Sequence, residues 1–180
     1  KWNIRAKSRS ILFVNQELGA NNYVGGMFRH LSSQGGIKSV ELDDSFYDTS
    51  IDLTYGIREK ELSWHLDLGY QNQIYNWYGL PMDFGSSLNA NDKANLINGI
   101  NPQQSYNNIY LGSKIALEGS IVKEASVRFN HFSDVLGSSE NRFYAKPSFE
   151  FEINDTAIKT NLIVDYLAGS FEKNYWNTNA

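Results

Sequence analysis

The sequence contains no cysteine, and this absence excludes disulfide frameworks, thiolate metal sites and cysteine nucleophiles. Its three histidines leave little for a histidine metal cluster. No apolar run approaches the roughly 18 residues that a membrane-spanning helix needs. Charged residues make up only 20% of the chain and the net charge is -4, so the concentrated basic surface of a nucleic-acid binder is missing. We therefore expect no nucleic-acid partner.

Catalytic motifs are lacking as well. The chain has no HExxH zinc motif and no glycine-rich phosphate loop between a strand and a helix. Ser133 follows closely after His131, but a hydrolase also needs a fixed base and an oxyanion site, and the sequence indicates neither. We expect no enzymatic activity and no catalytic residue.

One acidic segment contains Asp43, Asp44 and Asp48, whose carboxylates could hold calcium through oxygen ligands. A solvated loop explains the same composition more simply. No metal site and no cofactor are therefore expected, and a structural calcium ion at these three residues is kept as the alternative.

The dominant pattern is an alternation of apolar and polar residues, at 51–58 and again at 62–71. A period of two is typical of strands with one apolar face. The pattern recurs at 2–14, 23–31, 108–117, 124–130, 142–153 and 158–166. No helical period of useful length is found. The sequence therefore predicts an all-β fold of about eight strands.

Alternation alone is also typical of a soluble antiparallel sandwich, so the lengths of strands and links decide between the two. Several strands have ten or more residues, whereas soluble strands usually have ~5–6 and tilted membrane-spanning strands ~9–11. Short links at 16–22, 58–62, 117–121 and 154–156 alternate with longer ones at 32–49, 74–105 and 133–141. Outer-membrane barrels alternate short periplasmic turns with long external loops in this way.

We therefore predict a transmembrane antiparallel up-and-down β-barrel. Residues 1–180 would form one segment of it, with no separate domain, and we expect them to be part of a longer chain. On this assignment eight strands begin and end on the external side. Two local features are expected as well: a hairpin turn at 154–156, and a bulge or a sheet edge at Pro147, which cannot donate a ladder hydrogen bond.

In a barrel the polar face of the strands lines the lumen, where side chains can contact a solute. The candidates for this role are Arg58, His65, Asp67, Lys114, Arg128, Lys146 and Glu150. Aromatic side chains that gather near strand ends fit the girdles at a membrane–water interface. The candidates for the girdles are Tyr70, Tyr75, Trp77, Tyr78, Phe129 and Tyr166.

Three segments resemble a known family: NWYGLP at 76–81, NPQQSYNNIYLG at 101–112 and FSDVLGSSENRF at 132–143. Together they look like the barrel of TonB-dependent receptor-like outer-membrane proteins of Bacteroidota, over roughly residues 50 to 175. The resemblance implies a barrel of about 22 strands, an N-terminal plug and uptake of a scarce nutrient driven from the inner membrane. The sequence departs from the family in showing no plug domain, no TonB-contacting segment and no C-terminal aromatic residue.

The expected function is that of a Gram-negative outer-membrane receptor or transport protein that passes or imports a solute through a polar lumen. Its partners would be outer-membrane lipid, a solute, and an energy-coupling complex or other outer-membrane subunits. A passive porin and a barrel component of a secretion or surface-protein assembly remain open. So does a soluble secreted β-sandwich that binds carbohydrate through Trp64, Trp77 or Tyr78.

Overall fold

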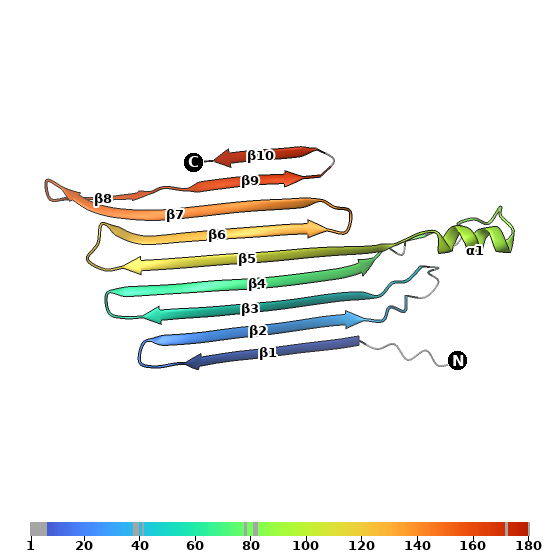
Figure 1. Ribbon diagram of the computed structural model, residues 1–180, viewed down its shortest axis with the longest axis horizontal. Helices are drawn as coiled ribbons and strands as arrows, with labels where there is room; N and C mark the ends of the chain where they lie inside the picture. Colours follow the sequence, from blue (N-terminus) through green and yellow to red (C-terminus); the bar gives the residue numbers. More distant parts are fainter. Residues whose placement is uncertain are drawn as a thin grey trace.

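The computed structural model describes residues 7–37, 40, 42–77, 79–80, 83–171 and 173–179. They form an all-β fold, in which ten strands make one antiparallel sheet (Figure 1). The strands are β1 (Lys7–Glu17), β2 (Asn22–Ser33), β3 (Phe46–Arg58), β4 (Leu62–Asn76), β5 (Gln103–Leu117), β6 (Val122–Asp134), β7 (Ser139–Ile153), β8 (Thr156–Asn161), β9 (Val164–Ser170) and β10 (Asn174–Asn179). One helix, α1 (Ala90–Asn98), lies between β4 and β5.

Each strand pairs with its neighbour in the sequence, so the sheet has the up-and-down order that the alternation predicts. β8 and β9 do not pair with each other. Both pair with β7 in the same register, with Asn161 opposite Ser148 and Val164 opposite Ala145. Together they cross the sheet once, and we count each such crossing as one pass. The sheet therefore consists of nine passes. It is open, since β1 and β10 do not pair with each other in the described part of the chain. Closure into a barrel is thus not part of this structure.

The prediction of eight strands was wrong because β10 was missed. Its sequence, NYWNTN, contains too few apolar residues to show the alternation. With the ninth pass, β10 runs toward the same end of the sheet as β1, so the described strands start at one end of the sheet and finish at the other (Figure 1). β1 itself ends at Glu17, beyond the predicted end at Val14. The residues before Lys7, where the prediction began this strand, lie outside the described residues.

The links fall into two groups, one at each end of the sheet (Figure 1). The short-turn end has the links 18–21, 59–61, 118–121 and 154–155. The opposite end, which we call the loop end, has the long links 34–45 and 77–102 and the short ones 135–138 and 171–173. The predicted long link at 133–141 was therefore wrong. The polar run from Ser138 to Arg142 looks like a loop in the sequence, but most of it belongs to β7.

Helix α1 also departs from the prediction, which found no helical segment. A cap at its N-terminus explains why this polar stretch is helical. The side chain of Asn89 accepts a hydrogen bond from the backbone N–H of Asp92 at 2.9 Å, and its amide donates to the Asp92 carboxylate at 2.7 Å. No residue of the helix is buried, so no apolar periodicity was needed to form it. No helix in the described part of the chain is long and apolar enough to cross a membrane.

The expected hairpin turn is confirmed. Asn154 and Asp155 connect β7 to β8 with φ angles of 48° and 59°. A two-residue loop with both central φ angles positive is a type I′ turn, whose twist matches that of the flanking strands. Asn and Asp tolerate this backbone conformation better than most residues.

Pro147 lies within β7 and disturbs the sheet on both sides. Toward β8 and β9, the N–H of Leu162 donates to the carbonyl of Pro147 at 3.1 Å, but proline has no N–H to return the bond. The pass is interrupted there, between Asn161 and Val164. On the other side, β6 has a register shift between Val122 and Glu124, next to Ala125, which faces Pro147. Of the two alternatives predicted at Pro147, the sheet edge is not found, because β7 is paired on both sides, and the bulge lies in the neighbouring strand β6.

Replacing Pro147 by alanine should supply the missing N–H and complete the pair with Leu162. We expect Pro147→Ala to raise the free energy of unfolding, relative to Pro102→Ala, by about 0.5–1.5 kcal/mol, the net value of one hydrogen bond. Equilibrium unfolding in urea measures this difference. Pro102 is the control because it lies outside the strands, so both variants share the gain of chain entropy in the unfolded state. If the two variants were equally stable, the missing N–H of Pro147 would not explain why the pass is interrupted between Asn161 and Val164.

Candidate functional site: the polar face of the sheet

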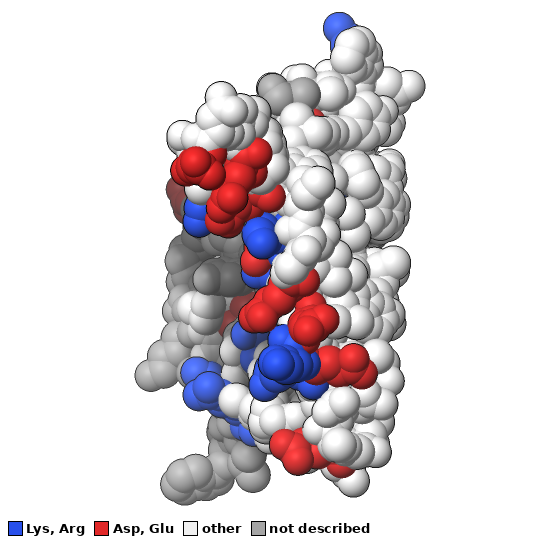
Figure 2. Space-filling view, turned by 90° about the vertical axis from the view of Figure 1, so that its left-hand side faces the viewer, with Lys and Arg blue, Asp and Glu red and all other residues white. Residues whose placement is uncertain are grey.

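Register places alternate residues of every strand on a common face. Directly paired residues share a face, so Asp52 on β3, Gly69 on β4 and Tyr110 on β5 lie together. We call this side the polar face and the opposite side, with Leu53, Leu68 and Leu111, the apolar face. All seven predicted lumen residues lie on the polar face: Arg58, His65, Asp67, Lys114, Arg128, Lys146 and Glu150. Figure 2, seen from the short-turn end, shows the charged residues gathered along one side of the molecule.

A recurrent arrangement on the polar face joins an acidic residue, a glycine and a tyrosine on three neighbouring strands. The ring of Tyr110 lies over Gly69, and its hydroxyl donates to the carboxylate of Asp52 at 2.7 Å. The ring of Tyr175 on β10 lies in the same way over Gly169 of β9, and its hydroxyl donates to Glu140 of β7 at 2.6 Å. Glycine is required under each ring because a Cβ there would overlap the ring atoms.

Aromatic rings also hold two arginines of this face. The guanidinium of Arg128 lies 4.1 Å from the centre of the Tyr110 ring, within the range of a cation–π contact. Its Nε donates to Asn130 at 3.0 Å. The guanidinium of Arg58 lies 5.4 Å from the ring centre of Tyr23. The rings therefore orient both cations without neutralising their charge.

Most other charges on the polar face have partners on the same or a neighbouring strand. Arg142 donates two hydrogen bonds to Asp165, at 2.8 and 2.5 Å. The closest atoms of Lys114 and Glu124 are 2.8 Å apart, and those of Lys159 and Glu150 are 3.3 Å apart. Further pairs join Arg29 to Asp48 at 3.6 Å and His65 to Asp67 at 3.4 Å. Among the described residues of this face, five cations have no carboxylate partner within 4.0 Å: Lys7, Arg9, Arg58, Arg128 and Lys146.

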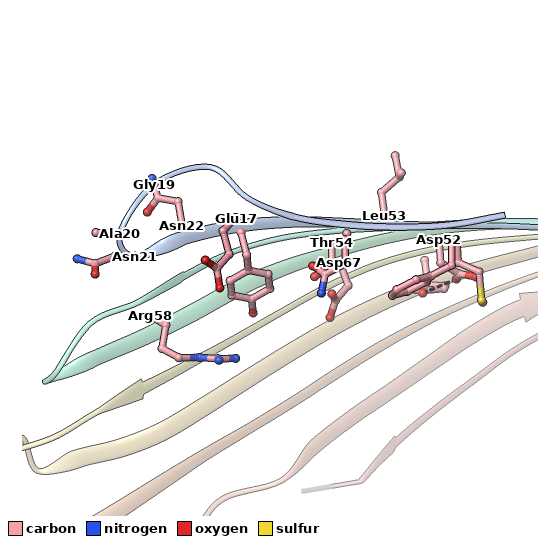
Figure 3. Close-up of a pocket in the computed structure, with 17 residues that line it drawn as sticks. Glu17, Gly19, Ala20, Asn21, Asn22, Asp52, Leu53, Thr54, Arg58 and Asp67 are labelled. Atoms are coloured by element: carbon pink, nitrogen blue, oxygen red, sulfur yellow. Dashed lines mark hydrogen bonds between the residues drawn. The ribbon is translucent and has the colours of Figure 1, made fainter.

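A hollow of about 530 Å³ lies against the polar face beside the hairpin of β1 and β2 (Figure 3). Glu17, Asp52 and Asp67 contribute carboxylates to its lining, and Arg58 contributes the guanidinium. Figure 3 shows Asp52, Asp67 and Arg58 on the same side of the strands, while Leu53 points to the other side. Carboxylates, a guanidinium and the rings of Tyr23 and Tyr110 together can hydrogen-bond a polar solute and stack against it.

The sequence did not single out Tyr23 and Tyr110 as site residues, nor the glycines under their rings, Gly56 and Gly69. A tyrosine or a glycine at a polar position of a strand is unremarkable in isolation. Only the register shows that each ring lies opposite a glycine, and that Tyr110 reaches past the intervening strand to Asp52.

The three candidate calcium ligands each have hydrogen-bond donors of their own. Asp44 accepts from the backbone N–H groups of Gly36 and Ile37, and Asp43 accepts from Ser45. Asp48 accepts from Gln71 at 3.0 Å. No group of three or more His, Cys, Asp or Glu side chains that could hold a metal ion is found in the described part of the chain.

The predicted girdle aromatics are scattered over the sheet. Phe129 and Tyr166 lie in one row with Phe143, in the middle of their passes and not at the ends. Tyr75 is on the polar face, where its ring stacks at 5.5 Å on that of Tyr106. Phe129 and Tyr166 were expected near strand ends because an aromatic residue close to a polar run in the sequence was taken to end a strand.

The other three girdle candidates do not share one position either, since Tyr70 lies in the middle of β4, six residues before the end of the strand at Asn76. Tyr70 is on the apolar face, and its hydroxyl donates to Asn107 at 3.0 Å. Trp77 lies just beyond the end of β4 and is exposed. Tyr78 falls outside the described residues.

The apolar face has no cover in this structure. No hydrophobic residue of the described chain is buried, and Leu53, Leu68 and Leu111 are 49%, 45% and 47% exposed. Apart from the bulge at Lys123, no Lys, Arg, Asp or Glu of a described strand lies on this face. A large exposed apolar face is typical of surfaces that contact lipid or protein.

An uncharged polar row crosses the apolar face near the loop end. It consists of Ser10, His30, Thr49, Asn72, Asn107, Ser133, Ser139, Ser170 and Asn174, each paired directly with the next. His30 and Thr49 share a hydrogen bond at 2.8 Å, and Asn72 donates to Asn107 at 2.8 Å. This polar row limits the apolar part of the face on the side of the loop end.

Comparison of the chain with protein-family models, with curated proteins and with solved structures identifies no match.

The contact between Tyr110 and Gly69 can be tested with a matched pair of variants. In Gly69→Ala the new methyl group overlaps the ring of Tyr110, which must leave Asp52, and we expect a loss of about 1–3 kcal/mol of stability. The control is Gly112→Ala, on the same face of the next strand, where a Cβ meets nothing closer than 3.8 Å. Urea unfolding measures both. Adding Tyr110→Ala to Gly69→Ala should remove the overlap, so the double variant should lose less than the sum of the two single losses.

Proposed function

We propose that this chain is a section of the wall of an outer-membrane β-barrel, which passes or imports a solute through a polar lumen in the manner of TonB-dependent receptors. The observation that carries the proposal is the apolar face. Long strands expose an uncharged row of Leu, Ile, Val and aromatic side chains on one side, while nearly all strand charges lie on the other side. This is the arrangement of strands with lipid outside and water inside.

The position of the apolar residues within each strand supports the same proposal. On the apolar face of β1 the apolar stretch runs from Leu12 to Val14, centred on Phe13. Directly paired residues on the strands between them connect Phe13 to Arg142 on β7, so these two residues occupy the same row of the sheet. The apolar stretch of β7 runs from Phe143 to Ile153 and is centred on Ser148, six residues closer to the short-turn end.

The apolar stretch also becomes longer across the sheet, from Leu12 and Val14 on β1 to Phe143–Ile153 on β7. Its limit at the loop end stays close to the polar row, so the stretch grows toward the short-turn end. On β7 it is as long as a tilted membrane-spanning strand, which has ~9–11 residues.

The alternatives share some of these features. A barrel subunit of a secretion or surface-protein assembly would have the same wall, and a passive porin would differ only in how transport is driven. The soluble carbohydrate-binding sandwich has less support, because the described strands form one sheet with no second layer on the apolar face. In addition, the indole N–H of Trp64, one of its proposed sugar-binding rings, is taken up by Ser113 at 2.8 Å.

The first experiment is to extract the protein from its source with and without detergent and to measure its intact mass with peptide mapping. A species well above 20.5 kDa that is soluble only in detergent would support a barrel wall within a larger protein. A species of 20.5 kDa that stays monodisperse without detergent would exclude it.

Lysine substitutions on β4 test whether the apolar face contacts lipid. Near the bilayer midplane we expect Leu68→Lys to cost about 2–4 kcal/mol, and Asn72→Lys, in the polar row of the same strand, about 0–1 kcal/mol. Gln71→Lys, on the polar face, is the control for introducing the charge. Reversible unfolding from phospholipid vesicles measures all three. If Leu68→Lys costs no more than Asn72→Lys, the apolar face does not lie in a bilayer.

A further inference from the structure

The hollow beside β1 and β2 contains side chains of both charge signs that do not pair with each other. None of its three carboxylates, those of Glu17, Asp52 and Asp67, has a Lys or Arg within 4.0 Å in the described part of the chain, although Arg58 lines the same hollow. Asp67 has only His65 nearby, at 3.4 Å, which is charged only if protonated. Four other acidic residues of the polar face each have a Lys or Arg within 4.0 Å: Asp48, Glu124, Glu150 and Asp165.

The guanidinium of Arg58 is oriented although its N–H groups are not used. It lies 5.4 Å from the ring centre of Tyr23, and that ring lies over Gly56. The Arg58 side chain makes no hydrogen bond or ion pair with another described residue. A planar guanidinium can donate two parallel hydrogen bonds to one carboxylate group. Arg58 can therefore bind the carboxylate of a ligand.

Two carboxylates lie in the rows that follow toward the loop end. Asp67 is directly opposite Thr54, in the row next to that of Gly56, and Asp52 is in the row after that. Successive rows of one face are two residues apart, which is about 7 Å along a strand. In Figure 3 the side chain of Arg58 extends along the strands in the direction of Asp67. The hollow thus has a cationic end and an anionic end.

An apolar surface lies beside the anionic end. Met27 on β2 is directly opposite Asp52, and Phe13 on β1 is directly opposite Met27. Both side chains line the hollow, and Phe13 and Met27 are 68% and 38% exposed. Exposed apolar groups of this kind are typical of surfaces that contact a ligand. A ligand with an apolar side chain would cover them.

We propose that the hollow binds short zwitterionic peptides that carry an apolar side chain. This inference rests on the proposed function, because it names the class of solute that the lumen takes. The C-terminal carboxylate of the peptide accepts hydrogen bonds from Arg58. Its N-terminal ammonium group donates to Asp67 and Asp52, and its apolar side chain contacts Phe13 and Met27.

The spacing of the charges favours a peptide over a single amino acid. In an amino acid the ammonium and carboxylate groups are bonded to one carbon atom, whereas in a dipeptide they are on two α-carbons about 3.8 Å apart. The longer separation fits two charges in rows about 7 Å apart. Thr54 lies on β3 between Arg58 and Asp52, and its hydroxyl makes no hydrogen bond to another described residue, so it can bond the peptide group. The volume of about 530 Å³ is in the range of small-molecule sites.

Binding of dileucine to the full protein in detergent micelles, measured by isothermal titration calorimetry, tests the proposal. N-acetyl-dileucine lacks the ammonium group, and dileucine amide lacks the carboxylate. We expect dileucine to bind at least about tenfold more tightly than either capped form, because each cap removes one charge-assisted contact. If dileucine amide binds as tightly as dileucine, the hollow recognises a cation alone and the proposal is overturned.

Two substitutions assign the two ends of the peptide. Arg58→Gln should lower the affinity for dileucine about tenfold and leave that for dileucine amide unchanged, because the amide has no carboxylate to bind. Asp67→Asn should lower the affinity for dileucine and leave that for N-acetyl-dileucine unchanged. The controls are Arg9→Gln and Glu152→Gln, which make the same changes of charge on the polar face outside the hollow. A control that weakens binding as much as its test variant would overturn the assignment of that charge.

Failure of this proposal can be told apart from failure of the barrel wall. If dileucine does not bind at about 1 mM to a protein that requires detergent, the peptide site is overturned and the barrel wall is not affected. A protein that stays monodisperse without detergent would exclude the barrel wall, whatever the hollow binds.

Discussion

The structure depends on a register that is kept across the whole sheet. Successive side chains of a strand point to opposite faces, so a slip of one residue in any pair would bring charged residues onto the apolar face. The pairing from β1 to β10 contains one such irregularity, at Lys123, and the register beyond it again places Lys146 and Glu150 on the polar face. The polar row and the hollow both depend on this single constraint.

The sequence predicts the faces well because alternation is a local property. The alternation within a strand shows which of its residues share a side, independently of the neighbouring strands. The seven candidates from Arg58 to Glu150 accordingly lie on one face. The type I′ turn at Asn154 and Asp155 is equally local and was equally predictable. What the alternation does not contain is the pairing between strands, so it could not bring Tyr110 to Gly69 and Asp52.

The errors of prediction occur where polarity was taken as a sign of irregular structure. β10 and the beginning of β7 are polar on both faces, so they show no alternation although they belong to the sheet. Helix α1 is polar on all sides and is recognisable only by the cap formed by Asn89 and Asp92. The girdle aromatics were misplaced for a related reason, since Phe129 and Tyr166 were assigned to strand ends that lie several residues further along. Element boundaries are set here by cross-strand hydrogen bonds, which a single strand does not reveal.

The rows in which a tyrosine lies over a glycine also bear on the dimensions of a barrel. The stagger of a closed sheet, together with the number of its strands, determines its radius. Tyr110 contacts Gly69 on the adjacent strand and Asp52 on the strand beyond it, so one side chain fixes two consecutive registers. Tyr175 does the same for β10, β9 and β7. In a sheet that closes, side chains of this kind would help to determine its radius through the stagger that they fix.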